Sequence, residues 1–139
     1  MNSKLFFYEF GKMIYRIDGF YREFAKRLDV KENLLWILYA LNDGNMHSQK
    51  EICDNWDLPR STVNTIMKEL ESDGYIELIQ IKGEKRELQV KLTEAGKNYS
   101  SILLKDLYEI ERKTYEKIKN SDVLKKMEDV LDGLYEELD

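Results

Sequence analysis

Hydrophobic residues recur at three- and four-residue steps along most of the chain, which is the period of an amphipathic helix. The first such stretch, residues 4–27, predicts one helix about 36 Å long at 1.5 Å per residue, which is longer than a small domain needs. Residues 31–41 predict a second helix, and its apolar run "LLWILYAL" leaves little polar face. A helix of this kind is buried on nearly all sides.

The next segment predicts a short helix that begins at a capping box. Ser48 and Glu51 have the required spacing, in which the serine side chain caps the helix and the glutamate lies in its first turn. The helix should end near Trp56, and the sequence "DLP" then leaves room for only a tight connection.

A two-faced helix is predicted after this connection, at about residues 60–73. Pro59 suits its first turn, and Gly74 suits the left-handed residue that stops a helix. The apolar residues of the helix share one face and its polar residues lie on the other. The apolar set is Val63, Ile66, Met67 and Leu70, and the polar set is Ser61, Asn64, Thr65 and Lys68.

Beyond Gly74 the hydrophobic period changes to alternation. Residues 76–81 and 88–92 form two alternating runs separated by "KGEKRE", which predicts a β-hairpin within about residues 75–92. Thr93 then caps a long helix, and Ser121 is expected to cap a last one. The apolar stripe of this last helix comprises Val123, Met127, Val130, Leu131, Leu134 and Leu138.

The order of elements predicts a mainly α fold with a small β-hairpin wing. It is a winged helix-turn-helix flanked by long N- and C-terminal helices, divided into residues 1–30, 31–93 and 94–139. Helices too long for a globule of 139 residues should bury their apolar faces against another chain. The flanking helices are therefore expected to form a dimer.

Composition limits the class of protein. The chain is 42% hydrophobic and 35% charged, as is typical of one soluble, helix-rich domain. One cysteine cannot form an internal disulfide, and Cys53 with the single His47 cannot assemble a zinc site from protein ligands alone. No metal or cofactor is expected, and a reducing, cytoplasmic setting is the simplest inference. No apolar run approaches the roughly 18 residues of a membrane span, and no export signal is visible.

The net charge of −5 argues weakly against phosphate binding, because affinity for nucleic acids comes from lysine and arginine. Much of the acidity lies in residues 93–139, which carry twelve acidic and eight basic side chains. A nucleic-acid surface would therefore have to come from a local arrangement of cations.

The helix-turn-helix and its wing provide such an arrangement. A helix of this type enters the major groove with its N-terminal residues nearest the bases. Arg60 can donate two hydrogen bonds to guanine, and Asn64 can pair with adenine. Supporting contacts to phosphates or bases are expected from Ser48, Gln49, Ser61, Thr62 and Thr65, with Lys68 on the backbone. At the wing tip, the candidates for the minor groove or its phosphates are Lys82, Lys85 and Arg86.

These residues resemble the winged helix-turn-helix of the MarR family of transcriptional regulators. The similar features are "LPRSTVN" at the start of the two-faced helix, "LESDGYI" at its end and "KLTEAGK" after the wing, within residues 34–100. The resemblance implies an obligate homodimer that binds a pseudo-palindromic operator as a repressor and is released by a small phenolic or oxidising signal. The wing departs from the family, because "KGEKRE" is short and lacks the common acidic-arginine pattern.

Each candidate also has a plainer interpretation. The polar face of residues 60–68 could be solvated surface, and the wing cations could serve only solubility. Cys53 is expected to be a buried small hydrophobe rather than a redox sensor, and His47 a surface turn residue or a minor phosphate contact. An effector pocket could include Tyr15, Trp36 and Tyr39, although core packing explains these aromatic residues equally well.

Two other classes of function are alternatives to a DNA-binding regulator. A winged-helix module that binds proteins and has lost DNA binding would fit the net acidity. An enzyme is not expected, because no Ser/His/Asp set, glycine-rich phosphate loop or metal cluster is visible and one histidine leaves few general-base options.

Overall fold

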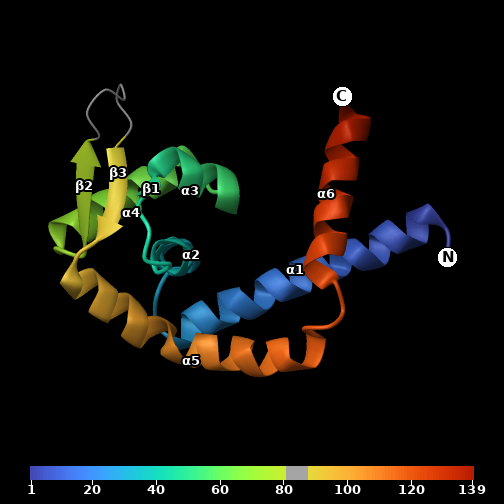
Figure 1. Ribbon diagram of the computed structural model, residues 1–139, viewed down its shortest axis with the longest axis horizontal. Helices are drawn as coiled ribbons and strands as arrows, with labels where there is room; N and C mark the ends of the chain where they lie inside the picture. The colour runs from blue at the N-terminus through green and yellow to red at the C-terminus, as the bar shows by residue number, and fades with distance from the viewer. Residues whose placement is uncertain (81–87) are drawn as a thin grey trace. The chain divides into compact units, whose positions relative to one another are not determined.

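The predicted order of elements is confirmed by the structure, a computed structural model that describes residues 1–80 and 88–139 (Figure 1). The described helices and strands are α1 (Ser3–Arg27), α2 (Glu32–Leu41), β1 (His47–Ser48), α3 (Gln49–Trp56), α4 (Arg60–Ser72), β2 (Ile76–Gln80), β3 (Leu88–Leu92), α5 (Glu94–Ile118) and α6 (Val123–Leu138). The fold is mainly α with a small antiparallel sheet, as expected. Over the described residues, no helix has a stretch long and apolar enough to cross a membrane.

The chain divides into two compact units, Met1–Leu104 and Lys105–Asp139. The first unit contains the helix-turn-helix and the sheet. Its core is built around α2, which packs against α1, α3, α4 and β3. None of the ten residues of α2 is exposed, so the prediction that this helix is buried on nearly all sides is confirmed. The core therefore fixes α3 and α4 against a common support.

The ends of the two central helices are set by local chemistry. Ser48 caps α3, because its Oγ accepts a hydrogen bond from the Glu51 N–H at 3.0 Å. Asp57 ends α3 in the left-handed region with φ of 49°, a conformation that Asp tolerates better than most residues. Pro59 is the N-cap of α4 rather than a residue of its first turn. A tight turn thus joins the two helices.

The C-terminus of α4 has the predicted glycine stop. Gly74 has φ of 79°, and its N–H donates to the Glu71 carbonyl while the Tyr75 N–H donates to the Leu70 carbonyl. These two backbone hydrogen bonds form the Schellman motif, which pairs carbonyl groups that would otherwise lack a donor at the end of a helix. It turns the chain directly into β2.

The sheet has three strands in the order β1-β3-β2, whereas the sequence predicted a two-stranded hairpin. β2 and β3 pair antiparallel, with Ile76 opposite Leu92 and Gln80 opposite Leu88. β1 adds two residues to the other edge of β3, with His47 opposite Val90. Residue 81, expected in the first strand, and the connecting segment lie outside the described residues.

The two C-terminal helices begin differently from each other. Thr93 caps α5 as predicted, because its Oγ1 accepts a hydrogen bond from the Gly96 N–H at 3.1 Å. Ser121 does not cap α6: its hydroxyl donates to the Ile118 carbonyl at the end of α5, and the N-cap is Asp122, with φ of 57° and no side-chain cap bond. The prediction for Ser121 was therefore wrong by one position.

Candidate nucleic-acid interface

The helix α4 has two chemically distinct faces. Its apolar side chains are buried, and Val63 and Met67 have no exposed area. The exposed residues of α4 include Arg60, Ser61, Asn64, Thr65 and Lys68, and towards its C-terminal end also Glu69, Glu71 and Ser72. The polar face is thus held outward by the packing of the apolar face, and it remains accessible in the first unit.

A hollow of about 550 Å³ lies between the starts of α3 and α4 and the strand β3. We call it the first hollow. Five of the predicted DNA contacts line it, namely Ser48, Gln49, Arg60, Ser61 and Asn64. The structure therefore brings together side chains from two helices that the sequence only placed near each other.

A second hollow, of about 360 Å³, lies beside the same helix. The predicted contacts Ser61, Thr62 and Thr65 line it together with Lys31 and other residues. Thr65 is already engaged, because its hydroxyl donates to the Ser61 carbonyl at 3.0 Å. Its oxygen can still accept a hydrogen bond, but the side chain is less free than the sequence suggested.

Two cations of α4 have no carboxylate partner among residues 1–80 and 88–139. Within the described part of the chain, neither Arg60 nor Lys68 forms an ion pair. By contrast, the Lys50 ammonium lies 3.6 Å from the Asp54 carboxylate. A positive charge without a local counter-charge is available to a phosphate or a base edge. The three wing candidates, Lys82, Lys85 and Arg86, lie outside the described residues.

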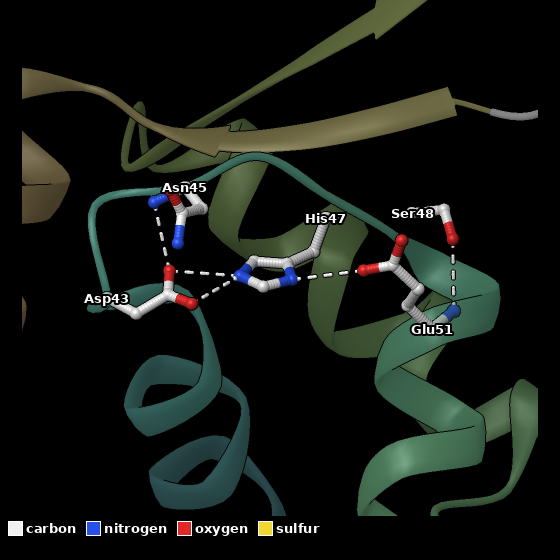
Figure 2. Close-up of polar contacts among 5 residues, drawn as sticks. All are labelled: Asp43, Asn45, His47, Ser48 and Glu51. Carbon is white, nitrogen blue, oxygen red and sulfur yellow. Dashed lines mark hydrogen bonds and ion pairs between the residues drawn. The ribbon is translucent and has the colours of Figure 1, made fainter.

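The sequence predicted that His47 is a surface turn residue or a minor phosphate contact, but the structure places it in β1 with its ring between two carboxylates. Its side chain is 19% exposed. Its Nε2 lies 2.9 Å from both carboxylate oxygens of Asp43, and its Nδ1 lies 3.1 Å from Glu51 Oε2 (Figure 2). Partial burial lowers the pKa of His47, but the hydrogen bonds to the two carboxylates outweigh it, so the pKa lies above its ordinary value. Glu51 therefore has a hydrogen-bond partner beside the start of α3, and this partner is a cation when the ring is doubly protonated.

Two of the three candidate effector residues lie in an aromatic cluster, which also includes Tyr21 and Trp56. Trp36 lies 4.7 Å from Tyr21, 5.9 Å from Tyr39 and 5.3 Å from Trp56, measured between ring centroids. All four residues are half-buried. Tyr15, on α1, is 77% exposed. The sequence could not distinguish the clustered aromatic residues from the exposed one, because all of these side chains fit the apolar stripe of a helix.

The sequence missed several residues at the two hollows. Lys50, Cys53 and Leu88 line the first hollow, and Lys31 and Asn33 line the second. Lys50 adjoins Gln49 in the first turn of α3 and could have been found with it. Leu88 and Lys31 could not, because they reach α4 only through tertiary packing. Cys53 is buried, as predicted, with 8% of its surface exposed.

Residues 28–87 match the sequence profile of the MarR family. A curated relative, the HTH-type transcriptional regulator SarZ of Staphylococcus haemolyticus (strain JCSC1435), is 26% identical over 83 residues. That match covers 60% of this chain and 56% of SarZ, so it spans little more than half of that relative's length.

Solved structures extend the likeness beyond the central domain. NMB1585, a MarR family regulator from Neisseria meningitidis, is 28% identical with a TM-score of 0.78, over 99% of this chain and 94% of that chain. Reduced AbfR, solved bound to DNA, is 16% identical with a TM-score of 0.68 over 99% and 94% of the two chains; AbfR is a protein of Staphylococcus epidermidis. With its two-faced α4, its three-stranded sheet and its long flanking helices, this chain is similar in sequence and in fold to the MarR family of winged-helix regulators.

Proposed function

We propose that the protein is a homodimeric, sequence-specific DNA-binding repressor of transcription that recognises a pseudo-palindromic operator. The observation that carries this proposal is the polar face of α4, where Arg60 and Asn64 line the first hollow and Arg60 has no ion-pair partner among the described residues. The family relationship and the DNA-bound relative of the same fold support it.

The first turns of α4 carry the base contacts in this proposal. A helix in the major groove presents its N-terminal residues to the base edges. Arg60 opens α4 and would donate to guanine, and Asn64, one turn later on the same face, would pair with adenine. Ser61, Thr62 and Thr65 would support these contacts, and Lys68 would neutralise a phosphate. Ser48, whose hydroxyl caps α3, would mainly hold Gln49 in place.

The flanking helices supply the dimer interface in this proposal. α6 has no buried residue, and Leu131 and Leu134 of its predicted stripe are both more than half exposed. On α1, a further set of large apolar side chains is exposed, namely Leu5, Phe6, Phe7, Met13, Ile14, Ile17 and Phe20. Apolar surface on this scale is uncommon on a soluble monomer. A second copy of the chain would cover it.

A binding-site selection on genomic DNA, followed by fluorescence anisotropy, tests the proposal. We expect an enriched site of two related half-sites with centres about 34 Å apart, occupied by two protomers. With roughly six phosphate contacts, affinity should fall about 10³-fold between 50 and 200 mM salt. If no site is enriched and a stable protein partner is recovered instead, the chain is a protein-interaction module.

A small aromatic effector is the second part of the proposal, and the aromatic cluster is its candidate site. The only two tryptophans of the chain, Trp36 and Trp56, both lie in this cluster. Salicylate, used as a probe, should therefore quench tryptophan fluorescence in a saturable manner. Tyr39→Ala should weaken the effect, whereas Tyr15→Ala, on an exposed side chain, should leave it unchanged. Fluorescence that does not respond to the probe would remove this cluster as the candidate site.

A further inference from the structure

The single histidine of the chain is held between two carboxylates that face its two ring nitrogens (Figure 2). A neutral imidazole has one N–H donor and one acceptor nitrogen, whereas an ionised carboxylate only accepts hydrogen bonds. A neutral His47 could therefore donate to Asp43 or to Glu51, but not to both. Only the doubly protonated ring donates at both short distances, 2.9 Å to Asp43 and 3.1 Å to Glu51.

The three residues come from consecutive segments of the chain that lead from α2 into α3. Asp43 lies in the turn after α2, His47 in β1 and Glu51 in the first turn of α3. His47 also immediately precedes Ser48, the N-cap of α3. Gln49 and Lys50, the first two residues of α3, line the first hollow. The charged chain Asp43–His47–Glu51 thus ties the α2–α3 turn to the edge of the candidate DNA-binding face.

We propose that His47 is a positioning residue of the DNA-binding face, which in its doubly protonated form fixes the first turn of α3 and makes DNA affinity depend on pH. The effect on DNA rests on the proposed function. The effect on α3 follows from the contacts within the free protein. When the ring loses one proton, one of its two carboxylate contacts loses its donor. The first turn of α3 then keeps its Ser48 cap but has lost one of the side-chain contacts at the ring.

The charges around His47 favour this assignment. The elements packed against it are the turn after α2, α3 and β3, and their charged residues are Asp43, Lys50, Glu51, Asp54 and Lys91. Lys50 pairs with Asp54. Lys91 follows Val90, the residue opposite His47, so strand alternation directs its side chain to the other face of β3. The two carboxylates are therefore the dominant charges at the ring.

The pH window follows from the directions of the two pKa shifts. Partial burial lowers the pKa of His47, but the hydrogen bonds to Asp43 and Glu51 raise it further, so the net pKa is above its ordinary value near 6.5. The contact is then complete below about pH 6.5 and is lost as pH rises through the folded-state pKa. Partial burial raises the pKa of Asp43, but its bonds to His47 and Asn45 lower it by more, so Asp43 stays ionised in that window.

DNA binding should weaken as this proton is lost. The Glu51 side chain is 55% exposed and would stand beside the phosphates without its cationic partner. One uncompensated unit charge at about 4 Å in water changes an equilibrium roughly fivefold. We therefore expect affinity for the selected site to fall about fivefold as pH rises through the His47 titration.

The protonation state can be measured on the free, full-length protein. Because the chain has one histidine, a long-range ¹H–¹⁵N spectrum reports a single imidazole. At pH 6 both ring nitrogens should give imidazolium shifts, with a titration midpoint above the ordinary value. The amide signals of Gln49 and Lys50 should shift with the same midpoint. The proposal is overturned if the ring is neutral at pH 6, or if the amide signals of Gln49 and Lys50 do not shift with the titration of the ring.

Matched variants separate this proposal from the proposed function. His47→Gln removes the titration but keeps a side chain that can hydrogen-bond, and it should give DNA affinity that is flat over the same pH range. Asp54→Asn, an exposed carboxylate on α3, should keep the wild-type pH profile. Equal pH profiles in His47→Gln and wild type overturn the link to DNA while leaving DNA binding intact. If the protein binds no DNA site specifically at any pH, the proposed function is overturned. The positioning role of His47 in the free protein is then tested by the amide titration alone.

Discussion

Gly96→Ala is expected to destabilise the protein by about 3 kcal/mol or more, at the upper end of the cost of overpacking. A Cβ on Gly96 would lie 1.9 Å from the Tyr75 carbonyl oxygen and 3.2 Å from the Leu92 side chain. That carbonyl also accepts a hydrogen bond from the Thr93 N–H at 3.0 Å, so neither partner can move without breaking the start of α5. Urea denaturation at a fixed protein concentration measures the change.

Gly11→Ala is the matched control for this substitution. Gly11 also lies inside a helix, but nothing comes within 4 Å of an added Cβ in the described chain. Alanine there should be neutral or should stabilise the helix by up to about 1 kcal/mol. A Gly96→Ala variant as stable as Gly11→Ala would mean that α5 does not approach Tyr75 as closely as the structure indicates.

Arg60→Ala and Asn64→Ala should each weaken binding to the selected DNA site more than any other single alanine substitution on α4. A specific base contact is worth about 1–3 kcal/mol, and a homodimer would lose two such contacts for each substitution. The loss should then be roughly 30-fold at its lower end. Fluorescence anisotropy at one salt concentration measures it.

Arg112→Ala and Asn98→Ala are the controls of matched residue type. Both side chains are exposed on α5, and neither lines the first or the second hollow. Their affinities should stay within about twofold of wild type, since surface substitutions away from special features usually have effects within 0.5 kcal/mol. If Arg60→Ala and Arg112→Ala behave alike, Arg60 does not contact the DNA.

The helices and their buried faces could be predicted from the sequence because each signal is local. The apolar spacing of α4, the Ser48 cap and the Gly74 stop each involve residues within about two turns of one another, and all three predictions were confirmed. The cap of α6 was missed for a related reason. Ser121 and Asp122 are both of types favoured as caps, so the local signal could not choose between them.

Features that depend on tertiary contacts could not be predicted. β1 has only two residues, too few to show alternation, and it is defined by pairing with β3 much later in the chain. The ring of His47 is held by Asp43 and Glu51, each four residues away, but only a turn that folds back brings both carboxylates to it. The first hollow likewise joins α3, α4 and β3.

The central claim, that α4 reads DNA sequence through Arg60 while Lys68 binds the backbone, is tested most directly by a ratio of affinities. Binding to the selected site and to a scrambled duplex should be measured for wild type, Arg60→Ala and Lys68→Ala at one salt concentration. We predict that Arg60→Ala lowers the ratio of specific to nonspecific affinity, whereas Lys68→Ala lowers both affinities equally and preserves it. An unchanged ratio in Arg60→Ala would contradict the account.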